Sequence, residues 1–147
     1  MSESTELPIR VSGRCLCGGV RYDVRGPMRP VIACHCNECR RFSGGIWNAT
    51  AAIRENLTIH DSGSLTWYRS SEQARRGFCG TCGSNLFIDF PDRPYVPIAA
   101  GTLDKPTGLR LAVHIFTREA GDYYEIGDDL PKFPDANHQL GSPETWE

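Results

Sequence analysis

The sequence lacks long apolar runs, internal repeats and low-complexity tracts. A membrane-spanning helix needs roughly 20 consecutive apolar residues, and no stretch approaches that length, so we expect a soluble protein with no membrane partner. Residues 1–10 are polar and lack the apolar core of a secretory signal, which favours a cytoplasmic location. A chain of 147 residues has the size of one domain, and we predict a single domain over residues 1–147.

The sequence also lacks a strong charge of either sign. The net charge of −2 argues against a nucleic-acid partner for the surface as a whole. Residues 1–118 carry 15 basic and 10 acidic side chains, whereas residues 119–147 carry one basic and eight acidic side chains. The basic residues are nearly all arginine, and five lie close to a cysteine in the sequence: Arg14, Arg40, Arg41, Arg75 and Arg76. They form either a solvated face or an anion-binding rim, because guanidinium groups suit carboxylates and phosphates.

No cysteine lies outside three short clusters. The seven cysteines occur as Cys15-Leu16-Cys17, as Cys34-His35-Cys36-Asn37-Glu38-Cys39 and as Cys79-Gly80-Thr81-Cys82. Disulfides are disfavoured, because an odd count leaves one thiol unpaired and bridges within the first two clusters would be strained. A thioredoxin-like redox site is disfavoured as well, because it needs one Cys-x-x-Cys in a strand–helix–strand unit.

The cysteine count predicts two zinc sites of different kinds. A structural zinc takes four protein ligands, whereas a catalytic zinc takes three and keeps one position open. Two cysteine pairs and one triplet therefore suggest one closed and one open site. Spacing alone leaves the grouping open: a zinc ribbon that joins Cys36 and Cys39 to Cys79 and Cys82 is equally allowed.

The pattern of short apolar segments and turns predicts a mainly β protein with little helix. Fifteen glycines and ten prolines imply many turns. Strict alternation at 20–24 and similar patterns elsewhere are typical of strands. We expect strands at 20–24, 31–34, 46–53, 57–60, 65–68, 76–79, 85–90, 97–101 and 109–116. We also expect a mobile or edge segment at 1–10, a turn or short helix at 37–42, a helix or turn within 118–126 and an extended tail after 131.

Three polar residues near these elements have weaker signals. Residues two apart on a strand share a face, so Cys34 and Cys36 can reach one metal while His35 points away. His35 is therefore expected to pack rather than to ligate. His114 lies in an apolar strand and reads as a hydrogen-bonded core histidine. Glu38 is either a solvated turn carboxylate or a general base.

Three motifs in order resemble those of the glutathione-dependent formaldehyde-activating family, whose domain is shared with centromere protein V. The motifs lie at 13–22, 34–44 and 78–84. Segments at 114–116, 124–126 and 129–131 fit the C-terminal part of the family. The resemblance spans roughly residues 13–133.

The resemblance implies a zinc-stapled β-tent fold of short antiparallel strands and a grouping of the cysteines. Cys15, Cys17, Cys79 and Cys82 match the structural zinc site of the family, and Cys34, Cys36 and Cys39 match its three-ligand catalytic site.

The implied activity is that of a carbon–sulfur lyase. Such an enzyme would form or cleave S-(hydroxymethyl)glutathione from glutathione and formaldehyde, because coordination to zinc turns a thiol into a thiolate. Arg40 and Arg41 are candidates for offsetting the charge of the thiolates and for holding the carboxylates of glutathione. The alternative is a non-enzymatic zinc module whose triplet binds a protein partner.

Overall fold

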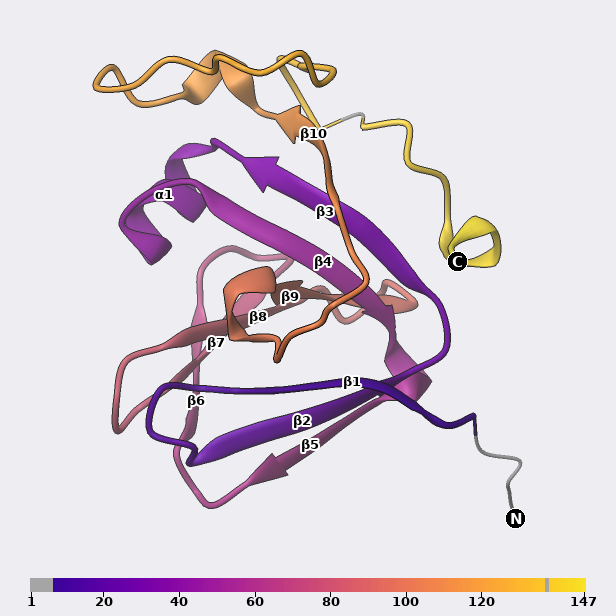
Figure 1. The fold of residues 1–147 in the computed structure, drawn as a ribbon. Helices are drawn as coiled ribbons and strands as arrows, with labels where there is room; N and C mark the ends of the chain where they lie inside the picture. Colours follow the sequence, from indigo (N-terminus) through magenta and orange to yellow (C-terminus); the bar gives the residue numbers. More distant parts are fainter. Residues whose placement is uncertain (1–6, 137) are drawn as a thin grey trace.

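A computed structural model describes residues 7–136 and 138–147, so residues 1–6 of the expected mobile or edge segment lie outside it. Within these ranges ten strands form two sheets, and seven residues form the one α-helix, α1 (Asn37–Ser43) (Figure 1). The predicted mainly β fold is confirmed. No helix in these ranges combines the length and the apolar character that crossing a membrane requires.

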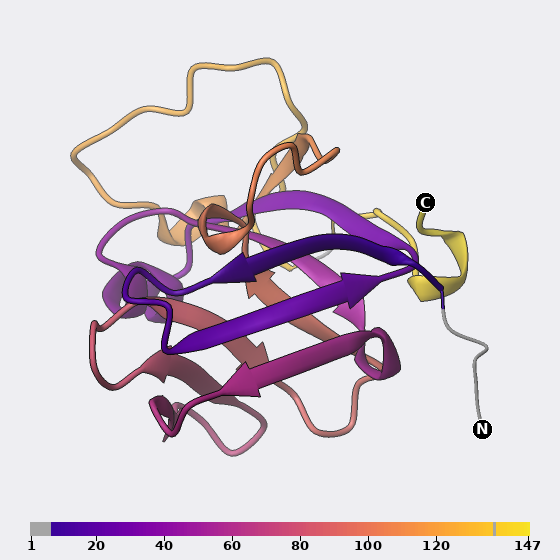
Figure 2. The ribbon, with the colours of Figure 1, turned by 60° about the horizontal axis from the view of Figure 1, so that its bottom comes forward.

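The smaller sheet has three antiparallel strands in the order β1-β2-β5, namely β1 (Ile9–Arg14), β2 (Val20–Arg25) and β5 (Leu57–Asp61). In Figure 2 this sheet faces the viewer in front of the larger one. The predicted strands at 20–24 and 57–60 are therefore present. Strand β1 begins within the segment expected to be mobile or at an edge, and it occupies an edge of this sheet.

The larger sheet has seven strands in the order β10-β3-β4-β9-β8-β7-β6. They are β3 (Met28–Cys34), β4 (Trp47–Ile53), β6 (Leu65–Arg69), β7 (Arg75–Cys79), β8 (Asn85–Asp89), β9 (Tyr95–Ala99) and β10 (Leu111–Ile115). Its pairs are antiparallel except that β10 runs parallel to β3. This pair departs from the expected antiparallel pattern, because strands far apart in the chain are not constrained by a hairpin turn.

Apolar side chains form two clusters, on the two faces of the larger sheet. On β8, Phe87 belongs to the first cluster and Ile88 to the second, as the alternation of side chains along a strand requires. The first cluster includes Tyr22 of the smaller sheet, whose ring meets that of Phe87 edge-on at 5.3 Å. The second includes Cys34 and Cys39. The triplet therefore lies on the face of the larger sheet that carries the second cluster.

The segment after β10 contains turns and no α-helix. A helix or turn was expected within 118–126, and the structure has a 3-10 turn at Thr117–Glu119 and a further turn at 122–123, with irregular chain around them. Tertiary hydrogen bonds hold this region: Tyr124 contacts His35, and Asp128 contacts His114. Local propensity does not register these contacts, which position the irregular chain.

We expect Gly77→Ala to lower the free energy of unfolding by roughly 1–3 kcal/mol through overpacking. Gly77 pairs with Trp67 on β6, and a Cβ at Gly77 would lie 2.9 Å from the Trp67 ring. Arg75 covers that ring at 4.1 Å, which restricts how far the ring can move. Urea unfolding measures the loss. Gly101→Ala is the control, because a Cβ there meets open space, and equal losses in both variants would contradict this explanation.

Candidate metal centres and the adjoining cavity

Four cysteines from two hairpin turns converge at one point. Cys15 and Cys17 lie between β1 and β2, and Cys79 and Cys82 lie at the end of β7 and in the turn before β8. Their sulfur atoms all lie within 4.8 Å of one another, and Cys17 Sγ is 3.7 Å from the Sγ atoms of both Cys15 and Cys79. A tetrahedral zinc with bonds of about 2.3 Å to sulfur separates its ligands by roughly 3.8 Å. The spacing of this four-sulfur cluster thus fits a closed zinc site.

Hydrogen-bond donors favour the thiolate forms of Cys79 and Cys82 in the four-sulfur cluster. The amide N–H of Val20 donates to Cys15 Sγ at 3.3 Å, and that of Cys82 donates to Cys79 Sγ at 3.4 Å. Hydrogen bonds from the Ser84 side chain and backbone lower the pKa of Cys82 to about 5. Because metal ligation requires deprotonated sulfur, these donors prepare the cluster for a cation.

The other three cysteines form a separate group, the triplet. Cys34 is the last residue of β3, Cys36 is the N-cap of α1, and Cys39 lies in the first turn of that helix. Their sulfur atoms lie within 4.8 Å of one another, and the Cys39 amide donates to Cys36 Sγ at 3.2 Å. The structure groups Cys36 and Cys39 with Cys34, so the ribbon arrangement with Cys79 and Cys82 does not form.

The triplet stabilises one thiolate well and further thiolates poorly. Side-chain hydrogen bonds from Cys34 and Cys39 lower the pKa of Cys36 to about 2, and the interaction with Cys36 raises the pKa of Cys34. Repulsion between neighbouring negative sulfur atoms disfavours full ionisation. All seven cysteines are free thiols. Three soft sulfur donors that need a positive charge to ionise together match the chemistry of a three-ligand zinc site.

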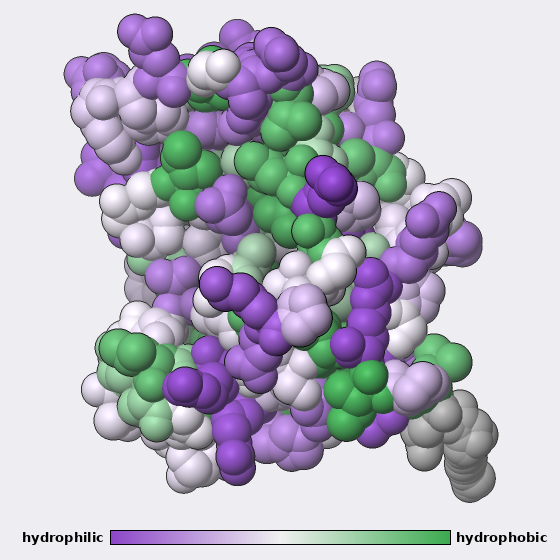
Figure 3. Space-filling view, in the orientation of Figure 1, coloured by the Kyte–Doolittle hydropathy of each residue, from purple (hydrophilic) through white to green (hydrophobic). Residues whose placement is uncertain are grey.

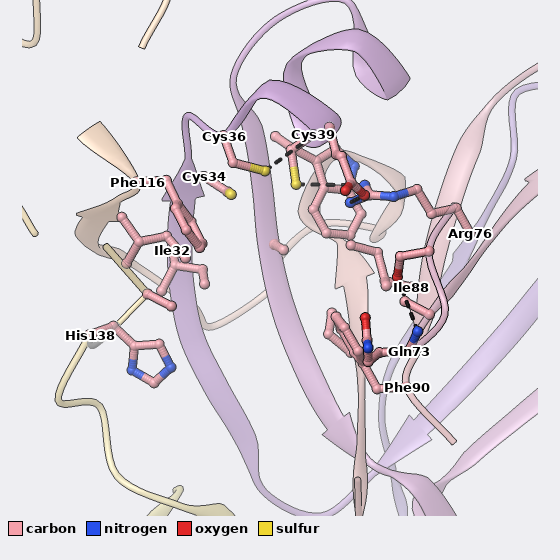
Figure 4. Close-up of a pocket in the computed structure, with 18 of the residues that line it drawn as sticks. Ile32, Cys34, Cys36, Cys39, Gln73, Arg76, Ile88, Phe90, Phe116 and His138 are labelled. Atoms are coloured by element: carbon pink, nitrogen blue, oxygen red, sulfur yellow. Dashed lines mark hydrogen bonds and ion pairs between the residues drawn. The ribbon is translucent and has the colours of Figure 1, made fainter. Parts of the chain in front are cut away.

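Arg76 of β7 supplies positive charge beside the triplet. Its Nη1 lies 3.6 Å from Cys39 Sγ, and its Nη2 lies 3.5 Å from Glu38 Oε1 (Figure 4). The guanidinium is buried and lies over the Phe42 ring at 5.2 Å. The sequence placed Arg76 among the arginines near the cysteines but did not single it out. Side chains alternate along β7, so Arg75 covers Trp67 on one face while Arg76 points to the opposite face, where the triplet lies.

Arg40 and Arg41 lie on α1 beside the triplet. Arg40 Nη2 and Arg41 Nε both donate to Asn37 Oδ1, at 3.2 and 3.0 Å. Neither belongs to the residues that line the cavity next to the triplet. Any contact of these two arginines with a ligand would therefore involve a part of that ligand outside the cavity.

A cavity of about 730 Å³ lies directly against the triplet. Its volume is in the range of small-molecule sites. Figure 4 shows the three cysteines at one end, with Arg76 pointing toward Cys39 and with Ile32, Phe116 and Ile88 around the space below. In Figure 3 hydrophobic side chains gather in the region of β3 and β4, flanked by hydrophilic ones. The cavity therefore offers an apolar interior with a few polar groups at defined places.

A chain of four polar side chains lies behind the triplet. Asp128 accepts a hydrogen bond from His114 Nε2 at 2.9 Å, and His114 Nδ1 shares a hydrogen bond with His35 Nε2, also at 2.9 Å. His35 Nδ1 in turn shares a hydrogen bond with the Tyr124 hydroxyl at 2.6 Å. Burial lowers the pKa of His35. His35 packs away from the sulfur atoms and His114 is a hydrogen-bonded core histidine, as the strand pattern predicted.

Sequence patterns did not indicate Tyr124 and Asp128 as partners of the histidines. They lie 89 and 14 residues from the histidines that they contact. Phe116, which lines the cavity, was also missed, although it lies in one of the recognised segments. Its backbone is in the left-handed region, with φ of 54°, which turns the chain directly after β10.

These features define a β protein with two cysteine centres, one of them open to a cavity. The family described as glutathione-dependent formaldehyde-activating enzyme matches residues 10–119, and the chain belongs to this family.

Two curated relatives are similar to the chain. A Halomonas elongata protein, provisionally named a glutathione-dependent formaldehyde-activating enzyme, is 26% identical over 79% of this chain and 80% of its own. An uncharacterised lyase of Schizosaccharomyces pombe is 26% identical over 56% of this chain and 61% of its own. A crystal structure of a Rhodobacter sphaeroides protein has a TM-score of 0.54 and 27% identity, and it covers 64% of this chain and 88% of its own.

We expect Tyr124→Phe to lower the free energy of unfolding by roughly 1–3 kcal/mol, because it leaves the buried Nδ1 of His35 without its hydrogen-bond partner. Tyr123→Phe is the matched control, since Tyr123 is 66% exposed. Denaturant unfolding at neutral pH compares the two variants. If Tyr124→Phe loses no more stability than Tyr123→Phe, the hydrogen bond between the Tyr124 hydroxyl and His35 does not contribute to stability.

We expect Cys82→Ser to destabilise the fold far more than Cys36→Ser. The four-sulfur cluster joins turns of both sheets, and apparent binding free energies of structural zinc are on the order of 10 kcal/mol. Thermal melts, with metal content measured by mass spectrometry, check this expectation. Thr81→Ser in the same turn is the control. Equal losses of stability in the two cysteine variants would show that the triplet is also structural.

Proposed function

We propose that the chain is a carbon–sulfur lyase that forms or cleaves a thiol–aldehyde adduct at the triplet. The observation that carries this proposal is the position of three converging cysteines at one end of a cavity of small-molecule size. The names of the two curated relatives support it: one is called a lyase, and the name of the other refers to glutathione and formaldehyde. Glutathione and formaldehyde are accordingly the first substrates to test.

Cys34, Cys36 and Cys39 would hold a catalytic zinc, and Cys15, Cys17, Cys79 and Cys82 a structural one. When bound to the triplet, zinc supplies an open coordination position and the positive charge that keeps a substrate thiol deprotonated. The sulfur donors and their spacing suit this ion. Free thiols also fit a reducing compartment, so we place the protein in the cytoplasm.

The proposed reaction is a reversible addition. In the forming direction the thiolate sulfur bonds to the aldehyde carbon, and the carbonyl oxygen takes up a proton. In the cleaving direction the hydroxyl group loses that proton, and the carbon–sulfur bond breaks. Glu38 lines the cavity beside Cys39 and has a side chain that is 53% exposed, so it can exchange this proton with water.

Arg76 partly neutralises the negative charge of the proposed zinc–thiolate site. Three thiolates with one zinc carry a net charge of −1, and a substrate thiolate adds another. The buried guanidinium beside Cys39 offsets that charge where solvent screening is weak. Arg40 and Arg41 remain our candidates for a carboxylate of a thiol that extends beyond the cavity.

The walls of the cavity favour a small molecule over a protein partner. Trp47, Ile88 and Phe116 give the space next to the sulfur atoms apolar walls. The alternative function, a non-enzymatic zinc module that binds a protein, would use an exposed face rather than an internal space. An exchangeable ligand on the triplet metal favours the enzyme, and a protein side chain as fourth ligand favours the module.

We expect the zinc-loaded protein to accelerate the exchange of formaldehyde between its free and glutathione-bound forms, measured by NMR at equilibrium. Cys36→Ser should reduce the exchange to the uncatalysed rate. Arg76→Met should slow it roughly tenfold or more, because hydrogen bonds to charged groups contribute about 1.5–3 kcal/mol. Arg69→Met is the control, since Arg69 is exposed and does not line the cavity. If the wild-type protein accelerates formaldehyde exchange with no small thiol, the lyase proposal is wrong.

A further inference from the structure

The end of the cavity away from the triplet contains a buried arginine. Arg29 is 4% exposed, lines the cavity and lies on β3, five residues before Cys34. At about 3.3 Å per residue, the two Cα atoms are roughly 15 Å apart. The positive charge of Arg29 is therefore separate from that of Arg76, which contacts the triplet directly.

A β-bulge aims Arg29 into the cavity. Ile32 pairs with Ala49 and Arg29 pairs with Ala51, so the three-residue step on β3 matches a two-residue step on β4. Simple alternation from Cys34 and Ile32 would have placed Pro30 on the cavity side instead. Bulges often redirect a side chain near functional sites. The Thr50 hydroxyl donates to the Arg29 carbonyl at 2.6 Å and stabilises the irregular backbone.

The charge of Arg29 has no carboxylate partner among the described residues. Its Nη2 donates to the carbonyl oxygens of Ala49 and Thr50, at 3.2 and 3.3 Å, and its buried Nε has no acceptor in these ranges. A buried, uncompensated charge is costly. Burial lowers the pKa of Arg29 to about 10, so it stays protonated at neutral pH.

The surroundings reinforce this positive end. Arg93 also lines the cavity, and its positive charge repels that of Arg29. Its guanidinium lies 3.8 Å from the Phe90 ring centroid. His138 also lines the cavity, but burial and the charge of Arg29 lower its pKa and so favour its neutral form. The two carboxylates that line the cavity belong to the triplet end: Glu38 on α1, and Glu119 bonded to the Asn37 amide. The cavity is thus polarised along its length.

From this arrangement we propose that Arg29 binds the carboxylate of an organic substrate whose sulfur end lies at the triplet. The walls between the two ends include Ile32, Ala49 and Ile88, so the substrate would be a thiol–aldehyde adduct with an apolar body and a remote carboxylate. The sulfur end of this inference rests on the proposed function, whereas the carboxylate site at Arg29 stands without it.

Hexanoate and 1-hexanol test the carboxylate site alone, because neither contains sulfur. Thermal-shift titrations of the zinc-loaded protein give an apparent dissociation constant for each. We expect hexanoate to bind wild type at least tenfold more tightly than 1-hexanol, and Arg29→Met to remove this preference. Arg29→Lys should keep part of it. Arg21→Met, at an exposed position outside the cavity, should keep all of it.

Arg29→Met is expected to fold, because it removes an unpaired buried charge and keeps the length of the side chain. Arg29→Gln, which keeps a donor for the Ala49 carbonyl, is the second variant and should also lose the preference. Equal binding of the two probes by wild type would overturn the proposal. So would an undiminished preference for hexanoate in either the methionine or the glutamine variant.

Cys36→Ser separates this inference from the proposed function. We expect it to abolish formaldehyde exchange and to leave hexanoate binding unchanged. A protein that binds hexanoate through Arg29 but catalyses no exchange would support the carboxylate site and contradict the lyase proposal.

A matched pair of thiols tests the two ends together. We expect 6-mercaptohexanoic acid to bind the wild-type protein at least tenfold more tightly than 6-mercaptohexan-1-ol does. In Arg29→Met the two thiols should bind equally tightly.

Discussion

The convergence of four cysteine sulfur atoms between two hairpin turns is the constraint on which the rest of the structure depends. Cys15 and Cys17 lie in a turn of the smaller sheet, and Cys79 and Cys82 lie at a turn of the larger one. A cation at this point would join both sheets at the same end, where the sulfur atoms approach to 3.7 Å. The first apolar cluster, which includes side chains of both sheets, then fills the space between them. The opposite face of the larger sheet remains available for the triplet and the cavity.

The distribution of charge organises that second face. At one end of the cavity, Arg76 lies beside Cys39 of the triplet, and the carboxylates of Glu38 and Glu119 lie nearby. At the other end, Arg29 and Arg93 face an apolar interior. Charges act more strongly beside such apolar walls than in bulk water, because the local dielectric constant is lower. A ligand with sulfur at one end and an anion at the other would therefore be oriented before any chemistry occurs.

The sequence by itself determined the chemical type of this protein. Clustered cysteines, without spare ones, indicated metal ligands rather than disulfides, and alternating short segments indicated a mainly β fold. The same alternation placed His35 away from its neighbouring cysteines. These conclusions were accessible because ligand spacing and side-chain periodicity are local properties. The grouping of the seven cysteines followed only from family resemblance, because several groupings satisfy the same local spacing.

Only the tertiary structure decided which charged residues face the cavity. Arg40 and Arg41 lie next to the triplet in sequence, yet they bond to Asn37 and do not line the cavity, whereas Arg76 arrives from β7. Arg29 reaches the cavity through a bulge that reverses the expected alternation, and a bulge depends on how two strands pair. The irregular segment after β10 depends on Tyr124 and Asp128 finding two histidines. Sequence patterns carry information about neighbours along the chain, and these contacts join residues that only folding brings together.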